Sequence, residues 1–152
     1  MRKTLLFHVC LFCFFVGPVQ AAPDLLFLGP DGGDVRSLSV HPAQPERIFL
    51  GTADGQVYVS QNGGRKWEKV VPGLKRRELA LDTLVFDPND ADTLYAAGWE
   101  LKSNRGALFR TRDGGDSWDR IDLGKYQSSI RAVAVSPLNS DLIAVGITEG
   151  VL

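Results

Sequence analysis

Short apolar segments separated by polar turns recur through residues 35–152 with a long period. VRSLSVHPAQPERIFLGT (35–52), LDTLVFDPNDADTLYAAG (81–98) and IRAVAVSPLNSDLIAVG (130–146) share one pattern. Each begins with alternating apolar residues, passes through a polar turn containing a proline, and continues into a second apolar run. Proline cannot donate to a sheet ladder, so its place between two apolar runs marks a turn between strands. The pattern predicts three repeated strand pairs.

The first two repeats continue in the same way. QVYVS (56–60) and ALFRT (107–111) read as third strands, and the short EKVV and DRIDL segments that come later read as fourth strands. Four short strands in a repeat of about 45–50 residues are typical of a β-propeller blade. We therefore predict an all-β chain of antiparallel four-stranded blades, with about two and a half blades present and no helix in the repeats.

The pattern also suggests where each part of the chain begins and ends. The third repeat reaches Leu152 just as its third strand begins. An open propeller would leave unpaired strand edges, so we expect this chain to be the N-terminal fragment of a longer protein. The predicted parts are a signal peptide (1–21), a lead-in (22–34), blade 1 (35–80), blade 2 (81–129) and a partial, truncated blade 3 (130–152).

The N-terminal segment has the three parts of a secretory signal peptide. Arg2 and Lys3 precede an apolar run over 4–16, and small residues follow up to Ala21. The run is shorter than the roughly 20 residues that a membrane-spanning helix needs. We expect cleavage after Ala21, a secreted or periplasmic location, and no membrane span in the mature chain.

Composition narrows the range of functions. Cys10 and Cys13 both lie in the leader, and His41 is the only histidine after it, which argues against a His/Cys metal site. His41 occupies the turn position that Asp87 and Ser136 fill in the other repeats, so a turn role is its simplest interpretation. The formal net charge of −1 gives no electrostatic case for nucleic acid. No phosphate-binding glycine motif is present, and no cofactor is expected.

Two segments match position by position as Ser/Thr-x-Asn/Asp-Gly-Gly-x-x-Trp. SQNGGRKW (60–67) and TRDGGDSW (111–118) resemble the Asp boxes, or BNR repeats, of a β-propeller family. Sialidases, sortilin/Vps10-type propellers, photosystem II assembly factor-like propellers and xyloglucanase-type glycosyl hydrolases carry similar repeats. The first copy departs from the motif at Asn62 and Lys66. The expected structural box residues are Ser60, Asn62, Gly64, Trp67, Thr111, Asp113, Gly115 and Trp118.

The chemistry of the box favours a structural role over a catalytic or cation-binding one. Gly64 and Gly115 can adopt the positive φ of a tight strand connection. Asn62 and Asp113 can accept hydrogen bonds from nearby backbone N–H groups, and an amide oxygen serves as well as a carboxylate. A general acid could not be replaced by Asn in this way. The tryptophans are expected to cover the turns.

A hydrolase remains the alternative because of Asp54. Xyloglucanase-type hydrolases carry a catalytic Asp in a Thr-Asp-x-Gly-Gly-Ala-Tyr segment, and GTADGQVYV places Asp54 near that slot without the Gly-Gly pair. Glycoside hydrolysis also needs a second carboxylate roughly 5–10 Å away. The resemblance to sialidases would require an arginine triad, yet Asp82 lies where Arg36 and Arg131 stand in the other repeats. A solvated turn acid is the favoured interpretation of Asp54.

The segment WELKSNRG (99–106) is longer than the corresponding connections in the other repeats. Extra loop length on a repetitive scaffold is where binding residues tend to lie. Trp99 could stack on a ring, while Lys102 and Arg105 could meet anionic groups; alternatively, Trp99 covers a blade edge. We therefore predict a non-enzymatic binding or assembly scaffold for a protein or carbohydrate ligand, and the alternative is a glycoside hydrolase fragment.

Overall fold

The computed structural model describes residues 29–30, 33–71, 73–74 and 78–152. The predicted signal peptide, its cleavage site after Ala21 and most of the lead-in lie outside these residues. The described part of the chain contains strands β1 to β11 and no helix, so the all-β prediction is confirmed. Accordingly, no described helix is long and apolar enough to cross a membrane.

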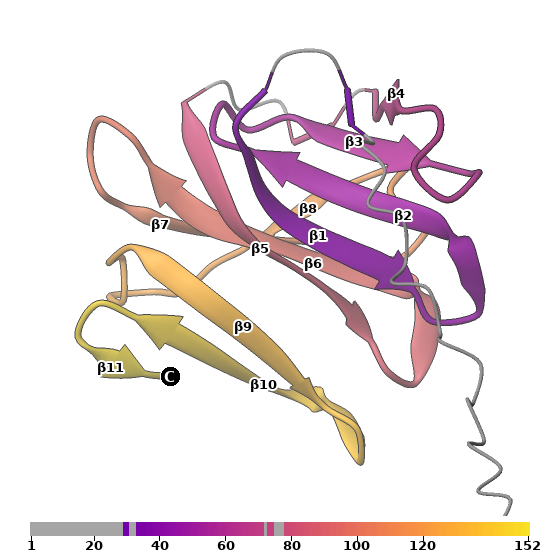
Figure 1. The fold of residues 1–152 in the computed structure, drawn as a ribbon. Coiled ribbons are helices and arrows are strands. Elements are labelled where there is room, and N and C mark those ends of the chain that lie inside the picture. Colours follow the sequence, from indigo (N-terminus) through magenta and orange to yellow (C-terminus); the bar gives the residue numbers. More distant parts are fainter. Residues whose placement is uncertain (1–28, 31–32, 72, 75–77) are drawn as a thin grey trace, which may run out of the picture.

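Three antiparallel sheets follow one another along the chain, each with its strands in sequence order (Figure 1). The first contains β1 (Val35–His41), β2 (Gln44–Thr52), β3 (Val57–Ser60) and β4 (Glu68–Lys69). The second contains β5 (Leu79–Asp87), β6 (Asp90–Glu100), β7 (Gly106–Thr111) and β8 (Asp119–Ile121). The third contains β9 (Ile130–Ser136), β10 (Asn139–Ile147) and β11 (Gly150–Val151). Two four-stranded blades and a three-stranded partial blade match the predicted architecture.

The first hairpin of each sheet is closed by a polar side chain that accepts backbone hydrogen bonds. His41 Nδ1 accepts the N–H groups of Ala43 and Gln44, both at 3.1 Å. Asp87 Oδ1 accepts the Asn89 N–H at 2.9 Å in the second sheet. Ser136 Oγ serves the same turn of the third sheet. His41 is therefore a turn residue, and burial against Phe86 gives its ring an apolar contact as well.

The hydrophobic core lies between neighbouring sheets rather than within any one of them. Strand residues alternate between two faces, and the faces that meet are almost entirely apolar. Phe49 of β2 is fully buried between the first and second sheets. Its cluster also includes Val57, Leu74, Leu79, Leu81, Leu84, Phe86, Leu94, Ala96, Ala107 and Phe109. A second cluster joins the second and third sheets through Tyr95, Ala97, Leu108, Ile130, Val133 and Val145.

The first strands of the three sheets lie next to one another, β1 against β5 and β5 against β9 (Figure 1). Small polar side chains at these contacts let the strands come close and form hydrogen bonds between them. Ser37 Oγ donates to the Leu81 carbonyl at 2.8 Å, and Thr83 Oγ1 donates to the Arg131 carbonyl at 3.2 Å. A Cβ at Gly51 would lie only 2.9 Å from Leu81 Cβ, so glycine is required for this packing. The three first strands therefore bring equivalent positions of successive sheets together.

The outward faces of the first and third sheets keep apolar side chains exposed within the described structure. Leu38 and Val40 on the first sheet are 61% and 55% exposed. Leu142 on the third sheet is 63% exposed. The second sheet, by contrast, packs against the first sheet through one cluster and against the third sheet through the other.

Removing the Phe49 ring should therefore cost far more stability than removing an exposed side chain of similar hydrophobicity. Phe49→Ala is expected to lower the free energy of unfolding by roughly 3–5 kcal/mol, because it leaves a cavity between two sheets. Leu138→Ala is the control, because Leu138 is 95% exposed, and it should change stability by less than about 0.5 kcal/mol. Urea denaturation followed by fluorescence and circular dichroism measures both. Equal effects of the two substitutions would contradict a core placed between the sheets.

Candidate functional site

The second Asp box forms a closed set of hydrogen bonds within its own turn. Thr111 is buried, and its Oγ1 donates to Asp113 Oδ1 at 2.6 Å and accepts the Gly115 N–H at 2.9 Å. Asp113 Oδ1 also accepts the Ser117 N–H at 2.9 Å, while the Ser117 hydroxyl donates to Asp113 Oδ2. The Asp113 carboxylate is therefore engaged with local donors.

The first box makes the corresponding bonds with an amide in place of the carboxylate, except that Lys66 has no hydroxyl to match that of Ser117. Ser60 Oγ donates to Asn62 Oδ1 at 3.1 Å and accepts the Gly64 N–H at 2.8 Å. Asn62 Oδ1 accepts the Lys66 N–H at 2.8 Å. Gly64 has φ 86° and Gly115 has φ 105°, values that favour glycine. The observed geometry fits a turn function that needs only an acceptor oxygen.

The two box tryptophans differ in their polar contacts. Trp118 packs against the core cluster between the first two sheets, and its Nε1 donates to the Gly115 carbonyl at 3.0 Å. Trp67 is half-buried, and its Nε1 has no hydrogen-bond partner among the described residues.

The second box also clamps its sheet onto the first, a contact that the sequence did not predict. Arg47 Nη2 on β2 donates to the Gly114 carbonyl at 2.9 Å, and its guanidinium lies 5.2 Å from the centre of the Phe49 ring. A Cβ at Gly115 would lie 3.1 Å from Phe49 Cε1. The second glycine of the box thus serves both the turn and the packing between blades.

Asp54 lies in a turn between β2 and β3 that uses part of the same pattern. The Thr52 hydroxyl donates to Asp54 Oδ1, and Thr52 Oγ1 accepts the Gln56 N–H at 3.1 Å. Thr111 and Asp113 are joined in the same way. Thr52 is buried and Asp54 is exposed. The carboxylate therefore has a local structural partner in the described structure.

Equivalent first-strand positions of the three sheets meet at Asp82. Arg36 of β1 donates to Asp82 Oδ1 through Nε at 3.2 Å and Nη2 at 3.0 Å. Arg131 of β9 donates through Nη1 to Asp82 Oδ2 at 2.9 Å. The Asp82 side chain is only 14% exposed, whereas those of Arg36 and Arg131 are 36% and 49% exposed. A partly buried carboxylate thus holds two more exposed guanidinium groups in place. We name these three residues and Trp99 the rim cluster.

Trp99 completes this cluster from the end of β6. Its Nε1 donates to Asp82 Oδ2 at 2.9 Å, and the Arg131 guanidinium lies 4.8 Å from the centre of its ring. The Trp99 ring therefore has a cation on one face, a geometry worth about 0.5–2 kcal/mol.

The structure does not bring the three predicted binding residues to one point. Trp99 belongs to the rim cluster, and Lys102 Nζ forms an ion pair with Glu78 at 2.6 Å. Arg105 lines a different hollow, beside β8. The sequence places Arg36, Asp82 and Arg131 at equivalent positions, and Asp82 interrupts the arginine triad that a sialidase would need. The contact between these three side chains was not predicted. A carboxylate at the middle one of three equivalent positions can accept hydrogen bonds from both flanking arginines, and this is what the structure shows.

A polar cavity of about 540 Å³ adjoins the rim cluster. It lies between the long loop after β6 and the turn between β10 and β11. Arg131 links the cavity to the rim cluster, and Ser103, Asn104, Lys125 and Glu149 are among its other lining residues. The described residues include no group of three or more His, Cys, Asp or Glu side chains suited to hold a metal ion. The arrangement suits recognition of polar, charged groups.

Comparison with known families identifies the class of protein. Residues 28–145 match the Sortilin-Vps10 family, described as sortilin, neurotensin receptor 3. The match covers most of the chain, and the chain belongs to this family.

Two curated relatives are similar in sequence to this chain. An oligoxyloglucan-reducing end-specific xyloglucanase of Emericella nidulans is 28% identical over 96 residues, covering 62% of this chain and 11% of that protein. A protein of Neosartorya fischeri described as a probable enzyme of the same kind is 27% identical, with the same coverage. The chain thus spans only about a tenth of the length of these relatives.

Solved structures share the fold. YCF48 from Cyanidioschyzon merolae has a TM-score of 0.61 and 21% identity, covering 78% of this chain and 35% of that one. YCF48 bound to D1 peptide has a TM-score of 0.64 and 18% identity, covering 82% and 38%. The GH74 enzyme of Niastella koreensis has a TM-score of 0.59 and 18% identity, covering 74% and 18%. These likenesses confirm that the sheets are propeller blades.

The Asp113 carboxylate should contribute to stability in a pH-dependent way. Hydrogen bonds from the Ser117 hydroxyl, the Thr111 hydroxyl and the Ser117 N–H hold the pKa of Asp113 well below its ordinary value of 3.8. A pKa that is lower in the folded state gives stability above the unfolded-state pKa, and this contribution is lost as the pH falls below about 4. Asp113→Asn should therefore be less stable than the wild type at pH 6, and the difference should shrink at pH 3.

Urea midpoints at both pH values measure this effect. Asp116→Asn is the matched control in the same turn, and it should show a small difference from the wild type at either pH. A difference between Asp113→Asn and the wild type that does not change with pH would contradict the assigned hydrogen bonds.

Proposed function

We propose that this chain is a non-catalytic binding module of an exported propeller, and that the rim cluster and its cavity hold a carboxylate-bearing segment of a partner protein. The observation that carries the proposal is the convergence of Arg36, Asp82 and Arg131 from three successive sheets. Such a site needs at least three blades in register, so it depends on the assembled fold rather than on one repeat.

The charges at the rim favour an anionic ligand group at Arg131. Arg36 is balanced by Asp82 and also lies 3.7 Å from Asp34. Arg131 uses only Nη1 on Asp82, and its Nε and Nη2 make no hydrogen bond within the described residues. The guanidinium is half exposed and borders the cavity. A guanidinium with two free donors suits bidentate binding of a carboxylate.

A peptide fits this site better than a neutral sugar. Sugars commonly stack on an open aromatic face, but Arg131 lies over one face of the only aromatic ring of the cluster, Trp99. The cavity walls that adjoin the cluster are formed by hydroxyl, amide and charged side chains. A propeller of the same fold has been solved with a bound peptide. This likeness supports a peptide-binding class without identifying the partner.

The second candidate is a fragment of a glycoside hydrolase, xyloglucanase-like or sialidase-like, with Asp54 as its carboxylate. The similarity to two xyloglucanases favours it. The local bond between Thr52 and Asp54 favours a turn role instead, because the same bond recurs between Thr111 and Asp113. Hydrolysis also needs a second carboxylate facing the same glycosidic bond. We therefore propose that Asp54 stabilises its turn, and we keep the binding module as the main proposal.

Arg131→Gln should weaken binding of acidic peptides by about tenfold or more. Losing a charge-assisted hydrogen bond costs about 1.5–3 kcal/mol, and about 1.4 kcal/mol is a factor of ten. The probes are short synthetic peptides with Asp and Glu residues and a free C-terminal carboxylate, titrated by calorimetry against the protein. Arg112→Gln removes an exposed arginine of the second Asp box and should leave the affinity unchanged. Equal losses in both variants, or no binding by the wild type, would overturn the proposal.

The hydrolase alternative predicts an enzymatic difference between the wild type and Asp54→Asn. We expect neither protein to release reducing ends from xyloglucan oligosaccharides or sialic acid from sialosides. Asp54→Asn keeps an oxygen acceptor for the Thr52 hydroxyl, so peptide binding should be unaffected. Hydrolysis by the wild type that is abolished in Asp54→Asn would instead establish the catalytic role of this residue.

A further inference from the structure

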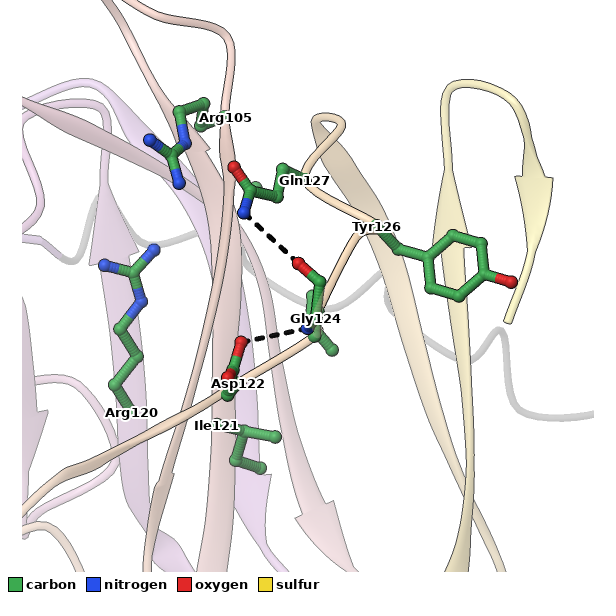
Figure 2. A pocket seen from close by; sticks show the side chains of 9 residues that line it. Arg105, Arg120, Ile121, Asp122, Gly124, Tyr126 and Gln127 are labelled. Carbon is green, nitrogen blue, oxygen red and sulfur yellow. Dashed lines mark hydrogen bonds between the residues drawn. The ribbon is translucent and has the colours of Figure 1, made fainter.

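A second hollow lies beside β8, apart from the rim cluster (Figure 2). Its volume is about 230 Å³. The walls come from the start of β7, from β8, and from the connection between β8 and β9. Arg105, Arg120, Asp122, Tyr126 and Gln127 are among the lining residues.

Two guanidinium groups reach this hollow from different elements. Arg105 ends the long loop before β7, and Arg120 lies on β8 opposite Phe109. Figure 2 shows Arg105 and Arg120 extending toward one another on the same side of the hollow. Neither guanidinium forms an ion pair with any residue that the structure describes. Like charges that line one hollow repel each other, and a bound anion would relieve this repulsion.

The opposite wall is held in place by local hydrogen bonds. Gly124 donates its N–H to Asp122 Oδ1 at 2.9 Å, and Gln127 Nε2 donates to the Gly124 carbonyl at 3.2 Å (Figure 2). The Gly106 N–H donates to the Gln127 carbonyl at 2.8 Å, which joins this connection to β7. The hollow is thus built by the fold, and the one carboxylate in it, Asp122, accepts a backbone N–H.

The donors present match an oxyanion. Two guanidinium groups offer planar arrays of N–H donors, and the Gln127 amide has a second N–H beyond the one given to Gly124. We propose that this hollow is an oxyanion site that binds one phosphate or sulfate group between Arg105 and Arg120. The site goes beyond the proposed peptide function, because it uses neither Asp82 nor Arg131. Gln127 lines both this hollow and the cavity beside the rim cluster, which makes the two sites neighbours.

Titration with inorganic phosphate and sulfate at constant ionic strength, followed by NMR, tests the proposal. We expect saturable shifts of the Nε–H signals of Arg105 and Arg120 and of the Gln127 amide, with chloride as the inert anion. Arg105→Gln and Arg120→Gln should each weaken phosphate binding by roughly fivefold or more, because each removes charge-assisted hydrogen bonds to the anion. Arg112→Gln and Arg131→Gln should leave it unchanged, and Arg131→Gln distinguishes this site from the rim. Backbone spectra of each variant establish that it is folded.

Comparing the affinities of phosphoserine and inorganic phosphate distinguishes two sources of the phosphate group. Tighter binding of phosphoserine indicates an anion carried on a larger ligand, whereas tighter binding of inorganic phosphate indicates a free ion; either result supports the site. Shifts that do not saturate, that are spread evenly over all arginines, or that survive both substitutions in the hollow would overturn the proposal. So would equal weakening by Arg112→Gln.

Discussion

Phe49 lies fully buried between the first and second sheets, and the packing of one sheet face against the next is the constraint on which the whole structure depends. No sheet has a separate core of its own, because the buried clusters lie between neighbours. The same packing sets β1, β5 and β9 side by side. Arg36, Asp82 and Arg131 therefore meet only when the blades are assembled, and the candidate binding site is a property of the blade interfaces.

The second Asp box supports the interface between the first two sheets. A buried hydroxyl, an acceptor oxygen and a glycine with positive φ close each turn, and Asn62 Oδ1 accepts the same backbone N–H bond as Asp113 Oδ1. In the second blade, the box also contacts the first through Arg47 and the Gly114 carbonyl. One short motif thus joins two strands and helps to hold two blades together.

The sequence predicted those parts of the fold that depend on local chemistry. Alternating apolar residues, the proline turns and the glycine pairs act over a few positions, so the strands and the box hydrogen bonds could be inferred from them. Contacts between distant positions could not. Asp82 was noted as an interruption of an arginine pattern, whereas in three dimensions it accepts bonds from Arg36, Trp99 and Arg131. The ion pair between Lys102 and Glu78 could not be predicted either, because the two residues are far apart in the sequence and no local pattern links them.

The three tryptophans allow a direct test of the claim that the ligand binds at the rim cluster and not at the Asp boxes. Trp99 donates its indole N–H to Asp82 at the rim, while Trp67 and Trp118 belong to the two boxes. The decisive measurement is the set of indole N–H signals during titration with an acidic peptide. The account predicts that the Trp99 signal moves in a saturable way while those of Trp67 and Trp118 stay in place. Movement of the box signals with a stationary Trp99 would contradict it.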